Sequence, residues 1–264
     1  MMDYAGRAAQ ADTFPKMLRL NAREHGGEIA LREKDLGLWR EFTWNDYQTR
    51  THDFALGMVE LGLGRDDVIG IIGDNRPDWV AAEIATHAIG AMSLGLYRDV
   101  LDEEAAYLLT YGEAKLVFAE DEEQVDKLLG LADRVPNLRH IIYSDPRGMR
   151  KYDDPRLMEA SKLVGLGRDR AAREPDLYDR LVDATDGDDV AILCTTSGTT
   201  ANPKLAMLSA GRVLRHCATY LSFDPKGPED EYVSVLPLPW IMEQIYALGK
   251  ALLSRMKVNF VEEP

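Results

Sequence analysis

Short apolar runs alternate with amphipathic segments over residues 68–143 of the chain. The runs at 68–73, 94–97, 115–119 and 138–143 are continuous enough for buried strands. The segments between them carry apolar residues at helical spacing, and Pro77 suits the first turn of one of these helices. Strands that alternate with helices predict βαβ units, a largely parallel sheet and an α/β fold.

The N-terminal pattern predicts a helix, a hairpin and a second helix. Residues 14–25 have helical spacing and end at Gly26, which is a frequent helix terminator. Residues 29–44 read as two strands around a turn at 35–37. We expect Asn45 to cap the next helix, which the glycines at 62 and 64 end.

The stretch 144–189 is polar and interrupted by glycine and proline. We expect one or two helices there, with Leu157 and Met158 on a buried side and residues 177–182 on another. The acidic run 183–189 lacks the alternating oxygen ligands and closing glutamate of an EF-hand, so a solvated turn is expected.

The last quarter of the chain begins with an apolar strand at 190–193, followed by a loop rich in hydroxyl groups at 194–204. Ser209 is placed to cap a helix over 210–221, and a strand is expected at 232–236. A helix then carries Ile241, Ile245, Leu248 and Leu252 at a period of 3.6 residues. A final strand is expected at 257–261.

The loop over 194–204 holds five hydroxyl residues, one glycine and one lysine. Backbone N–H groups and hydroxyls can donate to phosphate oxygens while a lysine balances their charge. Gly198 would let the backbone approach a ligand closely. An ordinary surface loop has a similar composition, so composition alone leaves both interpretations open.

Composition limits the classes of function. The 264 residues are 45% hydrophobic and 29% charged, as in globular proteins with a sizeable core, and suggest one large domain or two smaller ones. A net charge of −14 argues against nonspecific nucleic-acid binding. No apolar run approaches the length of a membrane span, although peripheral membrane contact is compatible with the sequence.

The cysteines and histidines indicate no metal site. Cys194 and Cys217 form no CxxC pair, and the five histidines are scattered. Both cysteines are expected to be buried, reduced thiols of a cytoplasmic protein. The N-terminus lacks the apolar segment of a signal peptide.

The loop with its preceding strand resembles the signature of the acyl-adenylate-forming enzymes, Thr-Ser-Gly-Thr-Thr-Gly-x-Pro-Lys-Gly. Here residues 196–205 read Thr-Ser-Gly-Thr-Thr-Ala-Asn-Pro-Lys-Leu. Ala201 and Leu205 stand where the family has glycine. Three further stretches, 72–79, 90–97 and 236–243, resemble family segments in the same order, and the last resembles a form typical of long-chain acyl-CoA synthetases.

The resemblance implies an enzyme that activates a long-chain fatty acid with ATP to acyl-AMP and then transfers the acyl group to CoA. ATP, Mg²⁺ and CoA are its implied co-substrates and metal. The implied phosphate-binding residues are Thr196, Ser197, Gly198, Thr199, Thr200 and Lys204. Thr199 or Thr200 would lie nearest Mg²⁺, but no metal ligand is assigned. Trp240 would border the acyl and adenylate pocket, or is a core tryptophan at a helix start.

Two departures from the family motif, and family segments that are missing from this chain, limit the activity that we expect of it. A positive φ at Ala201 would cost about 1 kcal/mol, and Leu205 would limit close backbone approach. The family's Tyr-Gly-x-Thr-Glu segment and its catalytic lysine are not found in 1–264, so no catalytic residue is assigned. We expect the chain alone to be inactive as a ligase.

The implied architecture is the N-terminal part of the synthetase large domain, with parallel-rich sheets and helices in αβαβα layers. The chain is interpreted as an incomplete domain, truncated or encoded by a split gene, which lacks the mobile C-terminal domain with the catalytic lysine. A subdivision into 1–188 and 189–264 is expected. A homodimer is compatible with the sequence.

Other functions remain as alternatives. A truncated homologue could bind nucleotide or acyl chains, or pair with a separate C-terminal half, without catalysis. A P-loop phosphotransferase is disfavoured because the Walker glycines are missing and Leu205 follows Lys204. A serine hydrolase is disfavoured because Ser197 lies in Thr-Ser-Gly and not in Gly-x-Ser-x-Gly.

Overall fold

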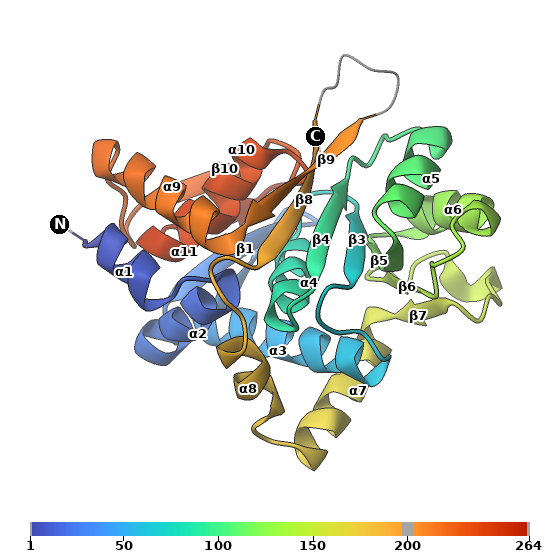
Figure 1. Cartoon of the computed structure of the whole chain (residues 1–264), viewed down its shortest axis with the longest axis horizontal. Coiled ribbons are helices and arrows are strands. Elements are labelled where there is room, and N and C mark those ends of the chain that lie inside the picture. The colour runs from blue at the N-terminus through green and yellow to red at the C-terminus, as the bar shows by residue number, and fades with distance from the viewer. Residues whose placement is uncertain (1, 197–202, 263–264) are drawn as a thin grey trace.

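The structure is a computed structural model that describes residues 2–196 and 203–262. It contains two β-sheets, with helices between them and on the far side of the larger sheet (Figure 1). The predicted α/β class with mostly parallel sheets flanked by helices is confirmed.

The larger sheet has six parallel strands and one antiparallel strand at its edge. In spatial order its strands are β7 (Leu157–Glu159), β6 (His140–Tyr143), β5 (Ala114–Ala119), β3 (Val68–Ile72), β4 (Met92–Leu96), β8 (Val190–Thr196) and β9 (Lys204–Ser209).

Side chains of the central strands alternate between two apolar cores, because successive residues of a strand point to opposite faces. In β5, Leu116 and Phe118 face one core, and Val117 and Ala119 face the other. Helices cover both faces: α5 (Asp102–Tyr111) and α6 (Glu122–Leu131) on one side, α3 (Trp44–Glu60) and α4 (Pro77–Ala88) on the other. Burial on both faces explains the continuous apolar runs of the sequence.

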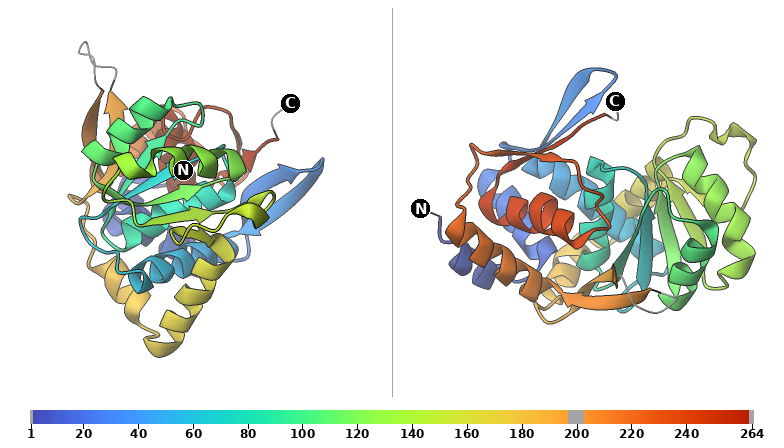
Figure 2. Two further views of the ribbon diagram at one scale, coloured as in Figure 1. Left: turned by 90° about the vertical axis from the view of Figure 1, so that its right-hand side faces the viewer. Right: turned by 90° about the horizontal axis from the view of Figure 1, so that it is seen from above.

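The smaller sheet joins distant parts of the chain. Its order is β10 (Glu231–Ser234), β11 (Lys257–Phe260), β1 (Ile29–Asp35) and β2 (Leu38–Thr43). β11 runs parallel to both of its neighbours, and β1 and β2 form the predicted antiparallel hairpin. The hairpin projects from the body of the molecule (Figure 2).

The remaining helices fill the space between the two sheets or lie along its margins (Figures 1 and 2). They are α1 (Tyr4–Gln10), α2 (Phe14–His25), α7 (Ala160–Arg173), α8 (Leu177–Asp183), α9 (Ala210–Phe223), α10 (Ile241–Glu243), the π-helix η3 (Gln244–Lys250) and α11 (Ala251–Ser254), with short 3₁₀ turns η1 (Ala132–Arg134) and η2 (Met149–Lys151).

Two expectations about local structure in the first two-thirds of the chain are wrong. Thr43, not Asn45, caps α3, because Thr43 and Asp46 exchange side-chain hydrogen bonds with each other's backbone N–H. Leu157 and Met158 belong to a strand and not to a helix, since they pair with β6 as the edge of the larger sheet. A strand of three residues leaves too short a pattern to recognise.

The segment after the hydroxyl loop also differs from the expectation. Residues 204–209 form a strand, β9, that pairs antiparallel with β8. Leu205 packs against the core under α5 and contributes apolar burial where the family motif has glycine. Ser209 occupies the cap position of α9, but its side chain makes no capping hydrogen bond.

The proposed boundary at 188/189 does not separate the two sheets. The larger sheet takes β3 to β7 from before this position and β8 and β9 from after it. The smaller sheet likewise combines β1 and β2 with β10 and β11. The subdivision describes the order along the chain and not two separate sheets.

A buried polar group connects the larger sheet to the helices that cover it. The carboxylate of Glu83 on α4 accepts hydrogen bonds from Ser93 on β4 (2.9 Å) and from Gln244 on η3 (3.1 Å). Ser93 also lies 3.0 Å from Nε2 of His87. Burial raises the pKa of Glu83 to about 7 and lowers that of His87 to about 3.

The raised pKa of Glu83 predicts a pH-dependent stability. The folded protein favours the neutral carboxyl of Glu83. Its contribution to the free energy of unfolding is therefore present below pH 4.5 and is lost as the pH rises through about 7. In Glu83→Gln the amide stays neutral, so we expect the free energy of unfolding of the variant relative to wild type to increase by about 3 kcal/mol between pH 4.5 and 8. Urea unfolding at several pH values measures this difference. Parallel pH profiles would contradict the expectation.

Candidate functional site

The carboxyl edge of the larger sheet brings together the ends of three strands. β3, β4 and β8 are parallel neighbours, so their last residues and the described residues that follow β3 and β4 meet at one edge. These residues are 73–76 after β3, 97–99 after β4, and the end of β8 at Thr196. In open parallel sheets, ligands bind in crevices at this edge.

The structure brings two of the expected phosphate-binding residues together. Thr196 ends β8 and is paired in register with Lys204 at the start of β9. The hydroxyl of Thr196 donates to the Lys204 carbonyl at 3.3 Å, and both residues are exposed. Residues directly opposite each other in an antiparallel pair point to the same face. Ser197, Gly198, Thr199 and Thr200, like Ala201, lie outside the described residues.

Trp240 approaches this edge on the face of the sheet that carries Thr196 and Lys204. Cys194 precedes Thr196 by two residues in β8, so their side chains share a face. Burial raises the pKa of the Cys194 thiol, and the nearby backbone N–H of Ile241 opposes this rise, so the residue after Trp240 lies beside Cys194. Trp240 therefore enters on the side of β8 that carries Thr196 and Lys204. Its side chain is 43% exposed, so it is not a core tryptophan.

The chain that carries Trp240 is held closely against the sheet. The Trp240 N–H donates to the Pro237 carbonyl at 2.9 Å and closes a tight turn. Pro239 lies against Gly95 of β4, where a Cβ atom would come within 2.9 Å of the proline Cα. Gly95 thus allows the close approach of the turn to the sheet.

A pocket of about 640 Å³ opens between this turn and the loops of the larger sheet. The loop after β3, residues 73–76, forms one wall, and the turn with Pro237 and Pro239 forms another. Arg98 and Asp74 line it as an ion pair with an N–O distance of 2.9 Å. Both polar and apolar surfaces are therefore available to a ligand there.

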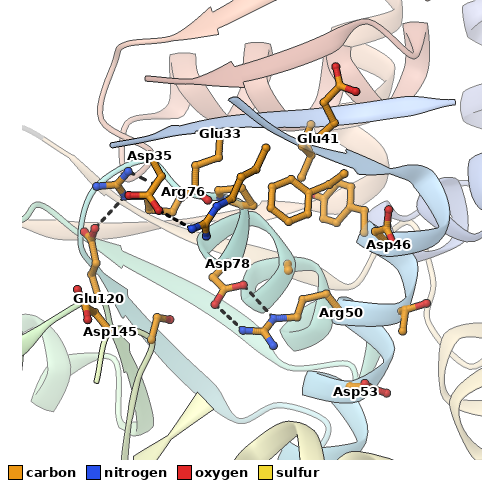
Figure 3. A pocket seen from close by; sticks show the side chains of 18 of the residues that line it. Glu33, Asp35, Glu41, Asp46, Arg50, Asp53, Arg76, Asp78, Glu120 and Asp145 are labelled. Carbon is orange, nitrogen blue, oxygen red and sulfur yellow. Dashed lines mark hydrogen bonds and ion pairs between the residues drawn. The ribbon is translucent and has the colours of Figure 1, made fainter. Parts of the chain in front are cut away.

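A second pocket, of about 930 Å³, lies on the other side of Arg76 and below the β1–β2 hairpin (Figure 3). Its walls carry paired charges: Arg50 bonds both oxygens of Asp78 at 2.9 and 2.6 Å, and Arg76 bonds Glu120 at 2.9 Å. Glu33 also faces the pocket, and burial raises its pKa. No motif predicted this pocket, because its lining comes from separate parts of the chain.

Three polar residues that shape the site were not expected from the sequence. Asn75 and Glu243 lie in stretches that resemble the family, but no role was assigned to them. Glu83 carried a usable signal, since it is a single acidic residue in an otherwise apolar segment of α4.

No metal site is formed by the part of the chain that the structure describes. Among residues 2–196 and 203–262, no three His, Cys, Asp or Glu side chains are grouped so that they could hold a metal ion. Cys194 and Cys217 are free and buried, as expected. In the same ranges, no helix is long and apolar enough to cross a membrane.

Curated relatives of the chain are fatty-acid ligases. The chain is 28% identical to the long-chain-fatty-acid–CoA ligase ACSBG2 of Xenopus laevis, over 88% of this chain and 31% of that protein. It is 29% identical to the long-chain-fatty-acid–CoA ligase 1 of Cavia porcellus, over 89% of this chain and 34% of that protein. The chain thus spans about a third of the length of these relatives.

Solved structures share the fold. The luciferase-like enzyme of the mealworm Zophobas morio superposes with a TM-score of 0.77 at 21% identity, over 96% of this chain and 55% of that one. The acetoacetyl-CoA synthetase of Streptomyces lividans gives 0.76 at 19% identity, over 95% and 38%.

The family model for AMP-binding enzymes matches residues 18–264, which is nearly the whole chain. Together with the distant similarity to fatty-acid–CoA ligases, this match confirms the resemblance noted in the sequence. The chain therefore belongs to the AMP-binding enzyme family, among relatives that form acyl adenylates and acyl-CoA.

Proposed function

We propose that this chain carries the phosphate-binding side of an acyl-activating site, and that the protein activates a long-chain fatty acid for transfer to CoA. The observation that carries the proposal is the register of β8 and β9, which directs Thr196 and Lys204 to the face where Trp240 stands. Groups that donate hydrogen bonds to phosphate and an apolar side chain would then border one space, as the joining of ATP to an acyl chain requires.

The proposed reaction has two steps. A carboxylate oxygen of the fatty acid attacks the α-phosphorus of ATP, an O–P bond forms, and the bond to the β-phosphate oxygen breaks to release pyrophosphate. The thiol of CoA then loses its proton and attacks the acyl carbon, and AMP leaves. Positioning and charge stabilisation contribute most to such a transfer.

The residues of the loop have distinct roles in this proposal. The ammonium of Lys204 would balance charge on the departing pyrophosphate. The hydroxyls of Thr196, Ser197, Thr199 and Thr200 and the backbone at Gly198 would donate to phosphate oxygens. Thr196 is exposed and its hydroxyl bonds only weakly to the Lys204 carbonyl, which supports its availability.

Trp240 would form the apolar border of the acyl chain. A large aromatic side chain at 43% exposure leaves apolar area that a ligand can bury. Trp240 directly follows Pro239, which lines the 640 Å³ pocket, and this neighbourhood supports the role.

Residues 1–264 would correspond to the N-terminal part of such a synthetase, with 1–188 and 189–264 as successive segments. ATP, CoA and a fatty acid are the proposed substrates, and Mg²⁺ the proposed metal. The free thiols of Cys194 and Cys217 are consistent with a cytoplasmic location.

Removing the Lys204 ammonium should weaken nucleotide binding. For Lys204→Ala we expect the Kd for ATP, measured by isothermal titration, to rise about tenfold, because one charge-assisted contact is lost. Lys162→Ala serves as control, since Lys162 is an exposed lysine on the distant helix α7. Equal affinities in all three proteins would remove Lys204 from the proposed role.

Truncation of Trp240 should weaken acyl binding and leave ATP binding unchanged. In Trp240→Ala we expect a fluorescent fatty acid such as parinaric acid to bind about tenfold more weakly, because apolar contact area is removed. Phe223→Ala is the matched control, since Phe223 is 85% exposed on α9. A similar loss in the control would show that the effect is not specific to the pocket.

The 264-residue chain by itself should not complete the reaction. Its sequence contains no Tyr-Gly-x-Thr-Glu segment for adenine and magnesium, so we expect no acyl-CoA above background with ATP, Mg²⁺, CoA and palmitate. Thin-layer chromatography of labelled palmitate measures the product. Product formation by the purified chain would contradict this expectation, whereas ligand binding without product agrees with a binding module.

A further inference from the structure

Asn75, in the loop after β3, forms hydrogen bonds with β10 and with the turn that contains Trp240. Its side-chain N–H group donates to the hydroxyl of Ser234 at 2.8 Å and to the carbonyl of Leu236 at 2.7 Å. Its side-chain oxygen accepts from the backbone N–H of Leu238 at 3.1 Å. The Asn75 amide, which follows β3 of the larger sheet, therefore pairs with two acceptors and one donor of β10 and the turn after it.

A buried carboxylate continues this network into the helix after Trp240. Glu243 is fully buried and accepts from the hydroxyls of Ser234 at 2.5 Å and Tyr232 at 2.6 Å. Ser234 therefore links Asn75 to Glu243. Trp240 lies between the two anchored points, three residues before Glu243 and two after Leu238.

Packing restricts the same turn from below. Leu238 is fully buried, and Pro239 lies against Gly95 of β4. Trp240, which follows these two buried residues, has an exposed side chain. The backbone is thus anchored on both sides of Trp240.

We propose that Asn75 is a positioning residue, whose three hydrogen bonds fix the 236–240 turn and so orient Trp240, the residue after the pocket-lining Pro239. Its importance for acyl binding rests on the proposed function, but its effect on Trp240 does not. The amide suits this task because Asn75 needs two donors and one acceptor at once, which an aspartate or leucine cannot supply.

The test uses the fluorescence of Trp240 in the whole chain without ligand. Trp39→Phe provides the background, because Trp44 and Trp79 are buried and Trp240 is then the exposed tryptophan among the described residues. In this background Asn75→Leu removes all three hydrogen bonds, and Asn75→Asp keeps only the acceptor for Leu238. We expect acrylamide quenching of Trp240 to about double in Asn75→Leu, since an indole now 43% exposed would become free, and to rise less in Asn75→Asp.

Asn259→Leu is the matched control for a purely structural effect. Asn259 is a buried amide of the smaller sheet that donates to Glu231 and to the Tyr232 carbonyl, so its loss should lower stability but leave the quenching of Trp240 unchanged. Circular dichroism confirms that each variant is folded, and Ser234→Ala provides a second break in the network if Asn75→Leu does not fold.

Unchanged quenching in folded Asn75→Leu, or in Ser234→Ala where that variant stands in for it, would overturn the proposal. An equal increase in Asn259→Leu would do the same. Parinaric acid titration of the same variants separates the two proposals. If Trp240→Ala binds the acid like wild type, the proposed function fails, while altered quenching in Asn75→Leu still assigns Asn75 its role at Trp240.

Discussion

The parallel order of β3, β4 and β8 is the constraint on which the candidate site depends. Parallel neighbours end at one edge, so the carboxyl ends of these strands meet there although β8 follows β4 by about 100 residues in the chain. β9 turns back antiparallel from this edge and places Lys204 opposite Thr196. Strand direction and register therefore place Thr196 and Lys204 side by side on one face of the sheet.

Polar groups inside the molecule connect the layers that carry these side chains. Burying them has a cost in solvation, which their hydrogen bonds offset when every group is paired. Glu83 links α4, β4 and η3, and Asn75 and Glu243 link the larger sheet to the smaller one. Apolar contacts would tolerate small shifts between the layers, whereas hydrogen bonds of fixed geometry define one arrangement. Such networks therefore suit a site assembled from two sheets.

The local pattern of apolar residues was sufficient to predict a helix or strand wherever the element is long and its buried positions recur regularly. The strands at 68–72 and 114–119 and the helix at 102–111 agree with the prediction because apolar period and length distinguish them clearly. The cap of α3, the short strand β7 and the strand β9 were missed. The strands depend on partners in other segments, β6 for β7 and β8 for β9, whereas the cap of α3 is a local Thr-x-x-Asp capping box that the sequence did carry. Pairing between strands leaves little trace in the residues of one segment.

By itself the sequence determined the α/β class, the family resemblance and the identity of the loop residues, because hydrophobic period and a specific hydroxyl motif are properties of consecutive residues. Tertiary structure alone decided that Thr196 and Lys204 share a face with Trp240, that Trp240 is exposed, and that Asn75 holds its turn. The last of these facts arises from contacts between residues more than 150 positions apart, such as Asn75 and Ser234. Spacing along the chain carries no information on such contacts, since register and packing between the two sheets create them.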